Sequence, residues 1–262
     1  MKTNLVFAVI LGAVLLVGVS LGSGPDKPAV SKTSKNAASK KSKHAGPVTA
    51  RNPADGPLDQ ILSNMHEAAL KTKSLQADIH QVKQHTQIGG KDEYKGDLIY
   101  LHEPRSKDKD KDKLRIRYYD ERGVADQDLL TDGDSVSLYQ PKILHVTKTS
   151  KSRQAKESPE FDFLATPYSS IPTLKQRYNI SYKGDESGWA MIQLKPRSSG
   201  SSIVEFTIWV DRSQWLPVQY RVLETNGDVT TFTLSNLRRN AKELPADAFK
   251  QSLAKGTKVI YR

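Results

Sequence analysis

The 262-residue sequence predicts an α+β fold that is mainly antiparallel β: a curved half-barrel sheet of about eleven strands, with an N-terminal helix and short lid helices over the concave face. From Leu75 onward, apolar and polar residues alternate in short segments, which is typical of strands with one buried face. The Asp-Gly pair at 132–133 and the Asn-Gly pair at 226–227 favour tight hairpin turns. Helical spacing is confined to one stretch ahead of the strands and to short pieces in mid-chain.

The N-terminal helix is expected to begin at Pro57 and to end near Lys73. Apolar residues recur in it at intervals of three or four positions, and polar residues fill most of the positions between them. The apolar positions are Leu58, Ile61, Leu62, Met65 and Ala69.

The predicted strands follow one another in hairpin order. They span residues 75–80, 94–101, 113–119, 125–130, 135–140, 143–148, 178–183, 189–195, 203–211, 216–223, 228–237 and 258–261. Residues 149–177 interrupt the series with three prolines among large apolar residues, and they predict short helices or an apolar lid-like excursion. A sheet this broad tends to curl. Because few helices are available to cover it, we expect an apolar concavity in which an apolar ligand would bind.

The first 57 residues differ in composition from the rest. Residues 1–22 carry Lys2 ahead of an apolar run at 5–21, and they predict a signal peptide or an uncleaved N-terminal anchor. Residues 23–57 are rich in Ser, Lys, Ala, Pro and Gly, which predicts a disordered basic linker. Eight Lys/Arg and two Asp give residues 1–57 a charge of +6, whereas residues 58–262, the predicted domain, carry +5.

No feature of the sequence indicates a catalytic or metal centre. The chain has no cysteine, which excludes disulfides, thiol catalysis and cysteine-ligated zinc. Its six histidines form no helical metal motif, and no nucleophile elbow or phosphate-binding glycine loop is present. We therefore expect no enzyme activity, no cofactor and no metal. The mild charge of the domain also predicts no specific nucleic-acid partner.

Four segments carry a family resemblance through their order and spacing. They are the leading helix with the strand 74–81, the aromatic-x-Gly-x-Leu pattern at 94–98, the Asp-Gly hairpin at 130–141, and a C-terminal block at 231–260 that includes Asn240, Leu244-Pro245 and Phe249. With these segments, residues 57–262 resemble the LolA-like family of periplasmic outer-membrane lipoprotein carriers.

The resemblance implies a half-barrel whose cavity, under a helical lid, holds acyl chains of lipoproteins or other lipids for transfer toward the outer membrane. It implies an inner-membrane donor and an outer-membrane acceptor as partners, and we expect a monomer in the periplasm. One departure concerns the lid: the family usually places an arginine before the proline that follows the second strand, whereas Glu103 precedes Pro104 here. The residues expected to line the cavity are Leu98, Tyr100, Ile116, Tyr118, Leu138, Val146, Phe206, Ile208, Tyr220 and Phe232, with Phe161 and Leu164 on the excursion.

Two alternatives stay open at this point. The first is a membrane-tethered sensor or interaction module of the same fold that regulates an envelope partner protein, which an uncleaved N-terminus would favour. The second is a polyanion-binding envelope protein that acts through the linker at 23–57.

Overall fold

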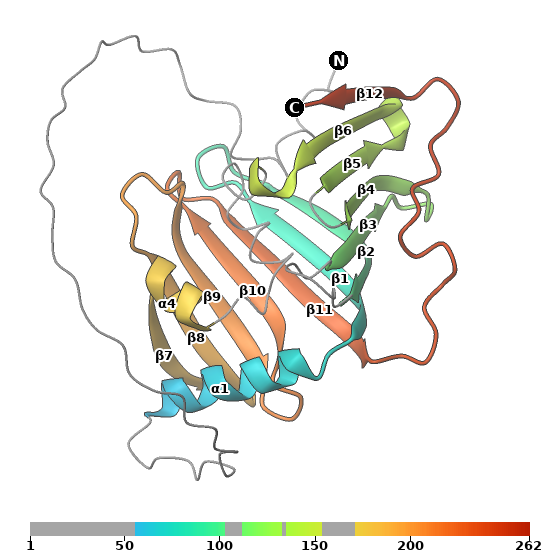
Figure 1. Ribbon diagram of the computed structural model, residues 1–262. Helices are drawn as coiled ribbons and strands as arrows, with labels where there is room; N and C mark the ends of the chain where they lie inside the picture. The colour runs from blue at the N-terminus through green and yellow to red at the C-terminus, as the bar shows by residue number, and fades with distance from the viewer. Residues whose placement is uncertain (1–55, 103–111, 133–134, 154–170) are drawn as a thin grey trace, which may run out of the picture.

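The computed structural model describes residues 56–102, 112–132, 135–153 and 171–262 (Figure 1). The helical elements are α1 (Pro57–Leu70), the 3₁₀ turn η2 (Pro141–Ile143) and α4 (Ile171–Arg177). The strands are β1 (Ser74–Gln84), β2 (Lys91–Leu101), β3 (Lys113–Tyr119), β4 (Ala125–Asp132), β5 (Ser135–Gln140), β6 (His145–Ser150), β7 (Tyr178–Glu186), β8 (Trp189–Pro196), β9 (Ile203–Asp211), β10 (Leu216–Glu224), β11 (Val229–Arg239) and β12 (Lys258–Tyr261).

All twelve strands belong to one curved sheet, in the order β12-β6-β5-β4-β3-β2-β1-β11-β10-β9-β8-β7. The predicted mainly antiparallel curved sheet of about eleven strands is confirmed, and each of the twelve segments predicted as strands overlaps one of its twelve strands. Every neighbouring pair is antiparallel except β12 and β6, which run parallel. The predicted regions 1–22 and 23–57 lie almost wholly outside the described residues, as do Glu103 and most of the predicted excursion.

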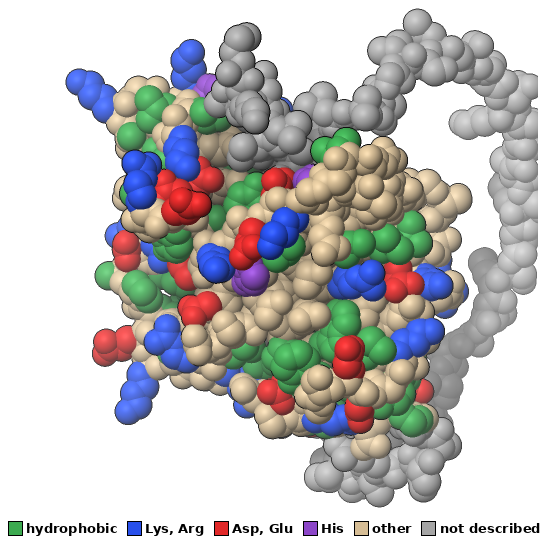
Figure 2. Space-filling model, turned by 180° about the vertical axis from the view of Figure 1, so that it is seen from behind, with side chains coloured by type: hydrophobic (Ala, Val, Ile, Leu, Met, Phe, Trp, Pro, Cys, Tyr) green, Lys and Arg blue, Asp and Glu red, His purple; other side chains and the backbone are tan. Residues whose placement is uncertain are grey.

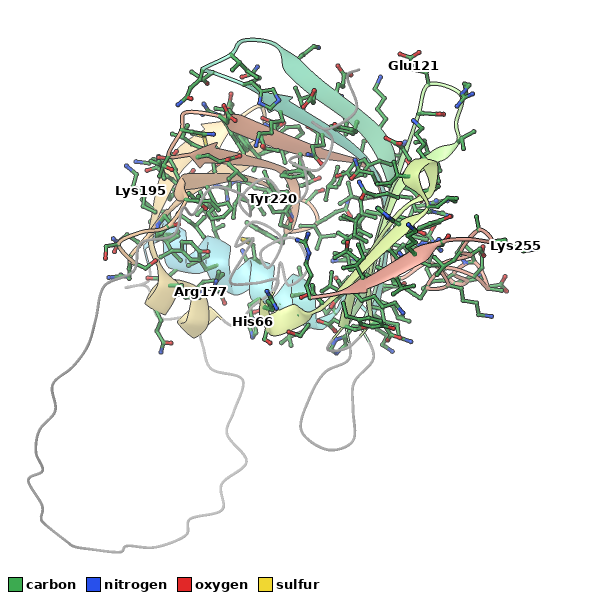
Figure 3. The ribbon with its side chains drawn as sticks, turned by 90° about the horizontal axis from the view of Figure 1, so that it is seen from above. His66, Glu121, Arg177, Lys195, Tyr220 and Lys255 are labelled. Atoms are coloured by element: carbon green, nitrogen blue, oxygen red, sulfur yellow. The ribbon has the colours of Figure 1, made fainter. Side chains whose placement is uncertain are left out.

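Helix α1 is shorter than predicted and lies inside the curve of the sheet. It ends at Leu70, where Thr72 Oγ1 donates a hydrogen bond to the Ala68 carbonyl oxygen at 2.7 Å. Figure 1 shows α1 across one end of β7–β11, and Figure 3 shows it enclosed by the two arms of the sheet. The face of the sheet that α1 contacts is therefore its concave face.

The sheet has two arms, one made of β2–β6 with β12 and the other of β7–β11. Strand β1 joins them, because it pairs with β2 on one side and with β11 on the other. Next to it, Gly96 of β2 faces Tyr118 of β3, and a Cβ atom at Gly96 would lie 1.8 Å from the Arg117 carbonyl oxygen. Only glycine fits so close an approach of two backbones. The aromatic-x-Gly-x-Leu pattern thus has a structural cause.

Asn240, at the end of β11, holds the junction between α1 and β1. Its Oδ1 accepts hydrogen bonds from the backbone N–H of Lys73 at 2.7 Å and of Ser74 at 3.2 Å, and its Nδ2 donates to the Lys71 carbonyl oxygen at 2.7 Å. The residue has φ of 54°, a left-handed conformation that asparagine tolerates better than most residues. One side chain therefore fixes the position from which α1 extends over the sheet.

The C-terminal segment after β11 packs against the convex face of β3–β5. Arg115 of β3 forms a two-pronged ion pair with Asp128 of β4, with nitrogen–oxygen distances of 2.9 and 2.8 Å. Its remaining Nη1 donates to the carbonyl oxygens of Asp247 and Ala248. Because Arg115 and Asp128 are both buried, this contact fixes the segment that leads to β12.

Candidate functional site: the concave face of the sheet

Apolar side chains form continuous rows across the concave face. In antiparallel pairs, residues in direct register point to the same face. Register joins Ala77 to Leu98, Leu98 to Ile116, Ile116 to Leu129 and Leu129 to Leu138. This row crosses five strands, and each of its members is buried.

The second arm continues the same surface. Ile208 of β9 faces Ile192 on one side and Tyr220 on the other, and Tyr220 faces Phe232 of β11. Phe232 in turn is the register partner of Gln81 in β1, which links the two arms.

The strands contribute many more residues to the apolar core than helix α1 does. Among the described residues the main hydrophobic cluster holds 28 buried residues, of which α1 contributes four and the strands the other 24. In a layered fold, a helix normally buries an apolar stripe that matches the sheet beneath it. Here the strands contribute six times as many core residues as α1, and all of them are buried.

Nine of the twelve residues predicted to line the cavity lie on this face and are buried. They are Leu98, Tyr100, Ile116, Tyr118, Leu138, Phe206, Ile208, Tyr220 and Phe232. Phe161 and Leu164 lie outside the described residues.

The predicted inward position of Val146 is wrong. Val146 faces Tyr139 and Val259, and the Tyr139 hydroxyl accepts a hydrogen bond from the Ala254 N–H of the C-terminal segment. Val146 therefore lies on the convex face. The cause is local: Leu144 has φ of 53° and ends η2, so β6 starts at His145 and its alternation does not continue from the preceding residues.

One end of the concave face is polar, which the sequence analysis did not anticipate. The buried Tyr118 hydroxyl donates to Gln81 Oε1 at 2.6 Å, and burial raises the pKa of Tyr118 above its ordinary value. Gln127 is the register partner of Tyr118 and is also buried. Its Nε2 makes no hydrogen bond with any described residue, so an amide donor remains available on this face.

A partly buried ion cluster lies beyond Gln81 on the same face. Lys83 is almost fully buried, and its Nζ lies 2.9 Å from Glu224 Oε1 and 3.8 Å from Asp228 Oδ2. His85 Nε2 lies 2.9 Å from Asp92 Oδ2, and its Nδ1 lies 3.4 Å from Asp228 Oδ2. Burial opposes ionisation of Asp228, but the Thr86 N–H and the charges of Lys83 and His85 outweigh it and lower the pKa of Asp228.

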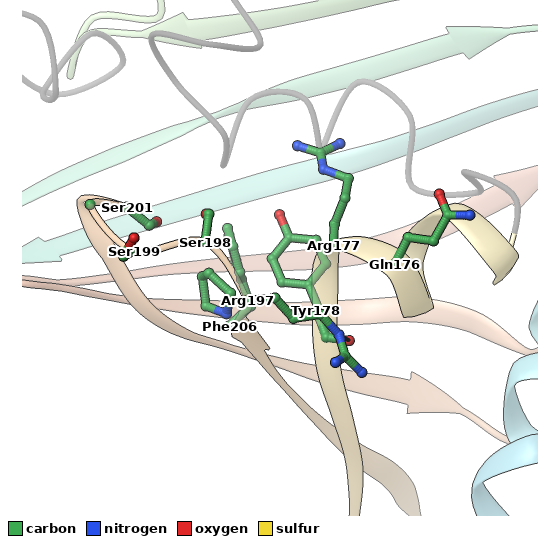
Figure 4. A pocket seen from close by; sticks show the side chains of 10 residues that line it. Gln176, Arg177, Tyr178, Arg197, Ser198, Ser199, Ser201 and Phe206 are labelled. Atoms are coloured by element: carbon green, nitrogen blue, oxygen red, sulfur yellow. Dashed lines mark hydrogen bonds between the residues drawn. The ribbon is translucent and has the colours of Figure 1, made fainter. Parts of the chain in front are cut away.

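A pocket of about 510 Å³ opens where β7, β8 and β9 meet (Figure 4). The rings of Tyr178 and Phe206 meet edge to face with centroids 5.8 Å apart, and the Arg177 guanidinium lies 5.8 Å from the centre of the Tyr178 ring. Of the predicted cavity residues that the structure describes, only Phe206 lines this pocket. The lining residues are Gln176, Arg177, Tyr178, Pro196, Arg197, Ser198, Ser199, Gly200, Ser201 and Phe206.

Sequence reasoning missed the polar half of this pocket. The stretch at 198–202 has the Ser- and Gly-rich composition of a flexible turn, yet four of its residues form one wall. Arg197 connects that turn to α4, because its Nε donates to the carbonyl oxygens of Lys175 and Tyr178 at 3.1 Å. No local signal reveals these contacts, which depend on the pairing of β7 with β8.

Within the described part of the chain, no three His, Asp or Glu side chains gather as metal ligands would. No helix there has both the length and the hydropathy that crossing a bilayer requires. The apolar run at 5–21 lies outside that part.

The comparison with protein families decides the classification. The family model described as "Outer membrane lipoprotein carrier protein LolA" matches residues 70–252, which is more than half of the chain. The chain belongs to the LolA family. The match runs from the end of α1 through β11 into the C-terminal segment, and it includes Gly96, Asn240 and the Asp-Gly pair at 132–133. No curated protein sequence matches the chain.

Several solved structures are distantly similar to this LolA-family chain. A Vibrio parahaemolyticus outer membrane lipoprotein-sorting protein domain is 17% identical, covering 72% of this chain and 95% of that one with a TM-score of 0.41. Lipoprotein LppX of Mycobacterium tuberculosis is 12% identical over 71% and 98% of the two chains, with a TM-score of 0.38. MucB in the Pseudomonas aeruginosa MucA/MucB complex is similar at 15% identity over 74% and 60%, with a TM-score of 0.44.

Proposed function

We propose that this protein is a periplasmic carrier that holds the acyl chains of lipoproteins or other lipids against the concave face of its sheet, for transfer toward the outer membrane. Membership of the LolA family supports a lipid- or lipoprotein-binding role. The observation that carries the proposal is the broad apolar concave face of the sheet, whose strands contribute 24 of the 28 buried cluster residues while α1 contributes four. The activity is binding and release, without catalysis.

The energetics suit an acyl ligand. Each methylene group that leaves water for an apolar site stabilises the complex by about 0.8 kcal/mol. The ester or amide group that joins an acyl chain to a lipid or lipoprotein also has a carbonyl oxygen, which needs a hydrogen-bond donor when it is buried. Gln127 Nε2 is a buried donor on the same face and would bind that oxygen.

A pair of matched valine variants tests the proposal. Val222 lies on the concave face and Val146 on the convex face, and both are buried, with 3% and 0% of their surface exposed. Val→Thr keeps the shape but places a hydroxyl in an apolar site, which costs roughly 1–3 kcal/mol. We expect similar losses of stability in both variants, measured by urea unfolding.

Only Val222→Thr should weaken the binding of a fluorescent fatty acid, by about tenfold. Equal affinities of Val222→Thr and Val146→Thr, or no fatty-acid binding by the unaltered chain, would refute the proposal.

The second candidate is a membrane-tethered interaction module that regulates a partner protein. It rests on the apolar run at 5–21 and the long basic linker at 23–57, which a freely diffusing carrier does not need. The mass of the protein isolated from its own envelope separates the two candidates. Removal of residues 1–22 supports the carrier, and an intact Met1 supports the tethered module.

A further inference from the structure

The edge of the sheet formed by β6 and β12 differs from the rest of the surface. We define the β6–β12 edge as residues 141–153 and 253–262. Of the ten exposed large hydrophobic residues in the described structure, six lie here. They are Ile143, Leu144, Leu253, Val259, Ile260 and Tyr261, with exposed fractions from 39% to 76%.

The charge of the β6–β12 edge has one sign. It contains seven Lys and Arg residues and no Asp or Glu, whereas the domain as a whole is close to balanced. Lys142 is neutralised by Asp120 and Asp126, at 3.5 and 3.0 Å. Lys148, Lys255, Lys258 and Arg262 have no acidic partner among the described residues, which leaves their charges uncompensated.

Apolar and basic side chains are interleaved along this edge. Val259 and Tyr261 are the register partners of Val146 and Lys148, and therefore point to the convex side. Lys258 and Ile260 point to the other side of the strand. Figure 2 shows Lys and Arg side chains beside hydrophobic ones at the corner that holds β6 and β12, and Figure 3 shows Lys255 projecting outward there.

We propose that the β6–β12 edge docks the domain onto an anionic lipid surface. A large apolar patch on a soluble domain marks an interaction site. Exposed aliphatic side chains and a tyrosine enter the boundary between headgroups and acyl chains, while lysine and arginine bind lipid phosphates above it. A second copy of this chain fits less well, because lysines on an edge strand oppose the addition of another strand.

The proposal goes beyond acyl-chain binding and does not depend on it. It concerns the outer rim of the sheet, at the far end of the strand order from the pocket between β7 and β9. Docking through this edge would bring a carrier or a tethered module against the membrane in one fixed orientation.

Site-specific labels test the contact in the full-length chain. Because the chain has no cysteine, Ile260→Cys provides a single site for an environment-sensitive fluorophore. Val204→Cys on β9 is the matched control, since Val204 is 43% exposed and Ile260 42%. Vesicles of phosphatidylcholine with about 30% phosphatidylglycerol should raise emission at least about twofold at position 260 and leave position 204 unchanged. Phosphatidylcholine vesicles alone should change neither.

Charge variants of the labelled Ile260→Cys chain complete the test. Lys255→Glu with Lys258→Glu should weaken partitioning onto anionic vesicles by at least about tenfold, because both charges lie at the lipid contact. Lys183→Glu with Arg221→Glu makes the same change in net charge on exposed residues of β7 and β10, and should have little effect. The linker at 23–57 is unchanged in both.

The proposal is overturned if the label at 260 does not respond to anionic vesicles, or if both labelled positions respond equally. A response at 260 without vesicles that grows with protein concentration would assign the edge to a second copy of the chain instead.

Discussion

Replacing Asn240 by alanine should destabilise the domain by about 3 kcal/mol. The side chain makes three hydrogen bonds, to Lys71, Lys73 and Ser74, at 2.7, 2.7 and 3.2 Å. Each is worth about 0.5–1.5 kcal/mol, and water can replace the two that are exposed, so their loss costs about 2 kcal/mol. Alanine at φ of 54° adds about 1 kcal/mol, because its Cβ crowds the following carbonyl oxygen.

Two control variants separate these contributions. Asn240→Gly removes the same hydrogen bonds without the left-handed penalty, and should cost about 2 kcal/mol. Asn236→Ala introduces the same penalty at φ of 52° and loses one exposed hydrogen bond, from Asn236 Nδ2 to Asp78 Oδ2 at 2.6 Å, but leaves the α1–β1 junction intact, so it should cost about 1.5 kcal/mol. Urea unfolding followed by circular dichroism measures all three. If Asn240→Ala lost no more stability than Asn236→Ala, the junction would not depend on Asn240 and the argument would fail.

Three other predictions concern the sheet. Gly96→Ala should cost more than about 3 kcal/mol or prevent folding, because its Cβ would overlap the backbone of β3, whereas Gly56→Ala meets nothing within 4 Å and should be nearly neutral in the same urea assay. Arg115→Ala should cost about 3–5 kcal/mol, since it leaves the Asp128 carboxylate buried and unpaired, and urea unfolding of the double variant Arg115→Met/Asp128→Leu should show a smaller loss. Because the pKa of Tyr118 is raised, its hydroxyl keeps its proton in the folded state, whereas in the unfolded chain it loses the proton near about pH 10. The stability that the protonated Tyr118 contributes is therefore complete below about pH 10 and declines above it. Ultraviolet titration should find one tyrosine that ionises only on unfolding.

The alternation of apolar and polar residues was sufficient to predict most of the sheet. Strands such as β9, with Phe206 and Ile208 on one face, follow directly from a period of two. The same signal failed at Val146, because the left-handed Leu144 resets the register. It also could not show that β12 runs parallel to β6, since that pairing depends on how the C-terminal segment crosses the convex face.

The candidate site was predictable only where it is apolar. From the sequence alone, Lys83 would be predicted to be an exposed residue of a strand. Its burial is explained by its partners Glu224 and Asp228, which lie more than a hundred residues away in the chain. The wall of the pocket near Arg177 likewise needs the pairing of β7 with β8. Tertiary contacts of this kind leave no periodic signal in the chain.

Mass spectrometry of the protein purified from its own envelope tests the central claim most directly. If the concave face holds acyl chains, native spectra should show bound lipid close to one per chain, and Val222→Thr should retain less of that lipid than Val146→Thr when both keep the circular dichroism spectrum of the unaltered protein. Absence of lipid from the unaltered protein, together with no uptake of a hydrophobic dye, would contradict the claim.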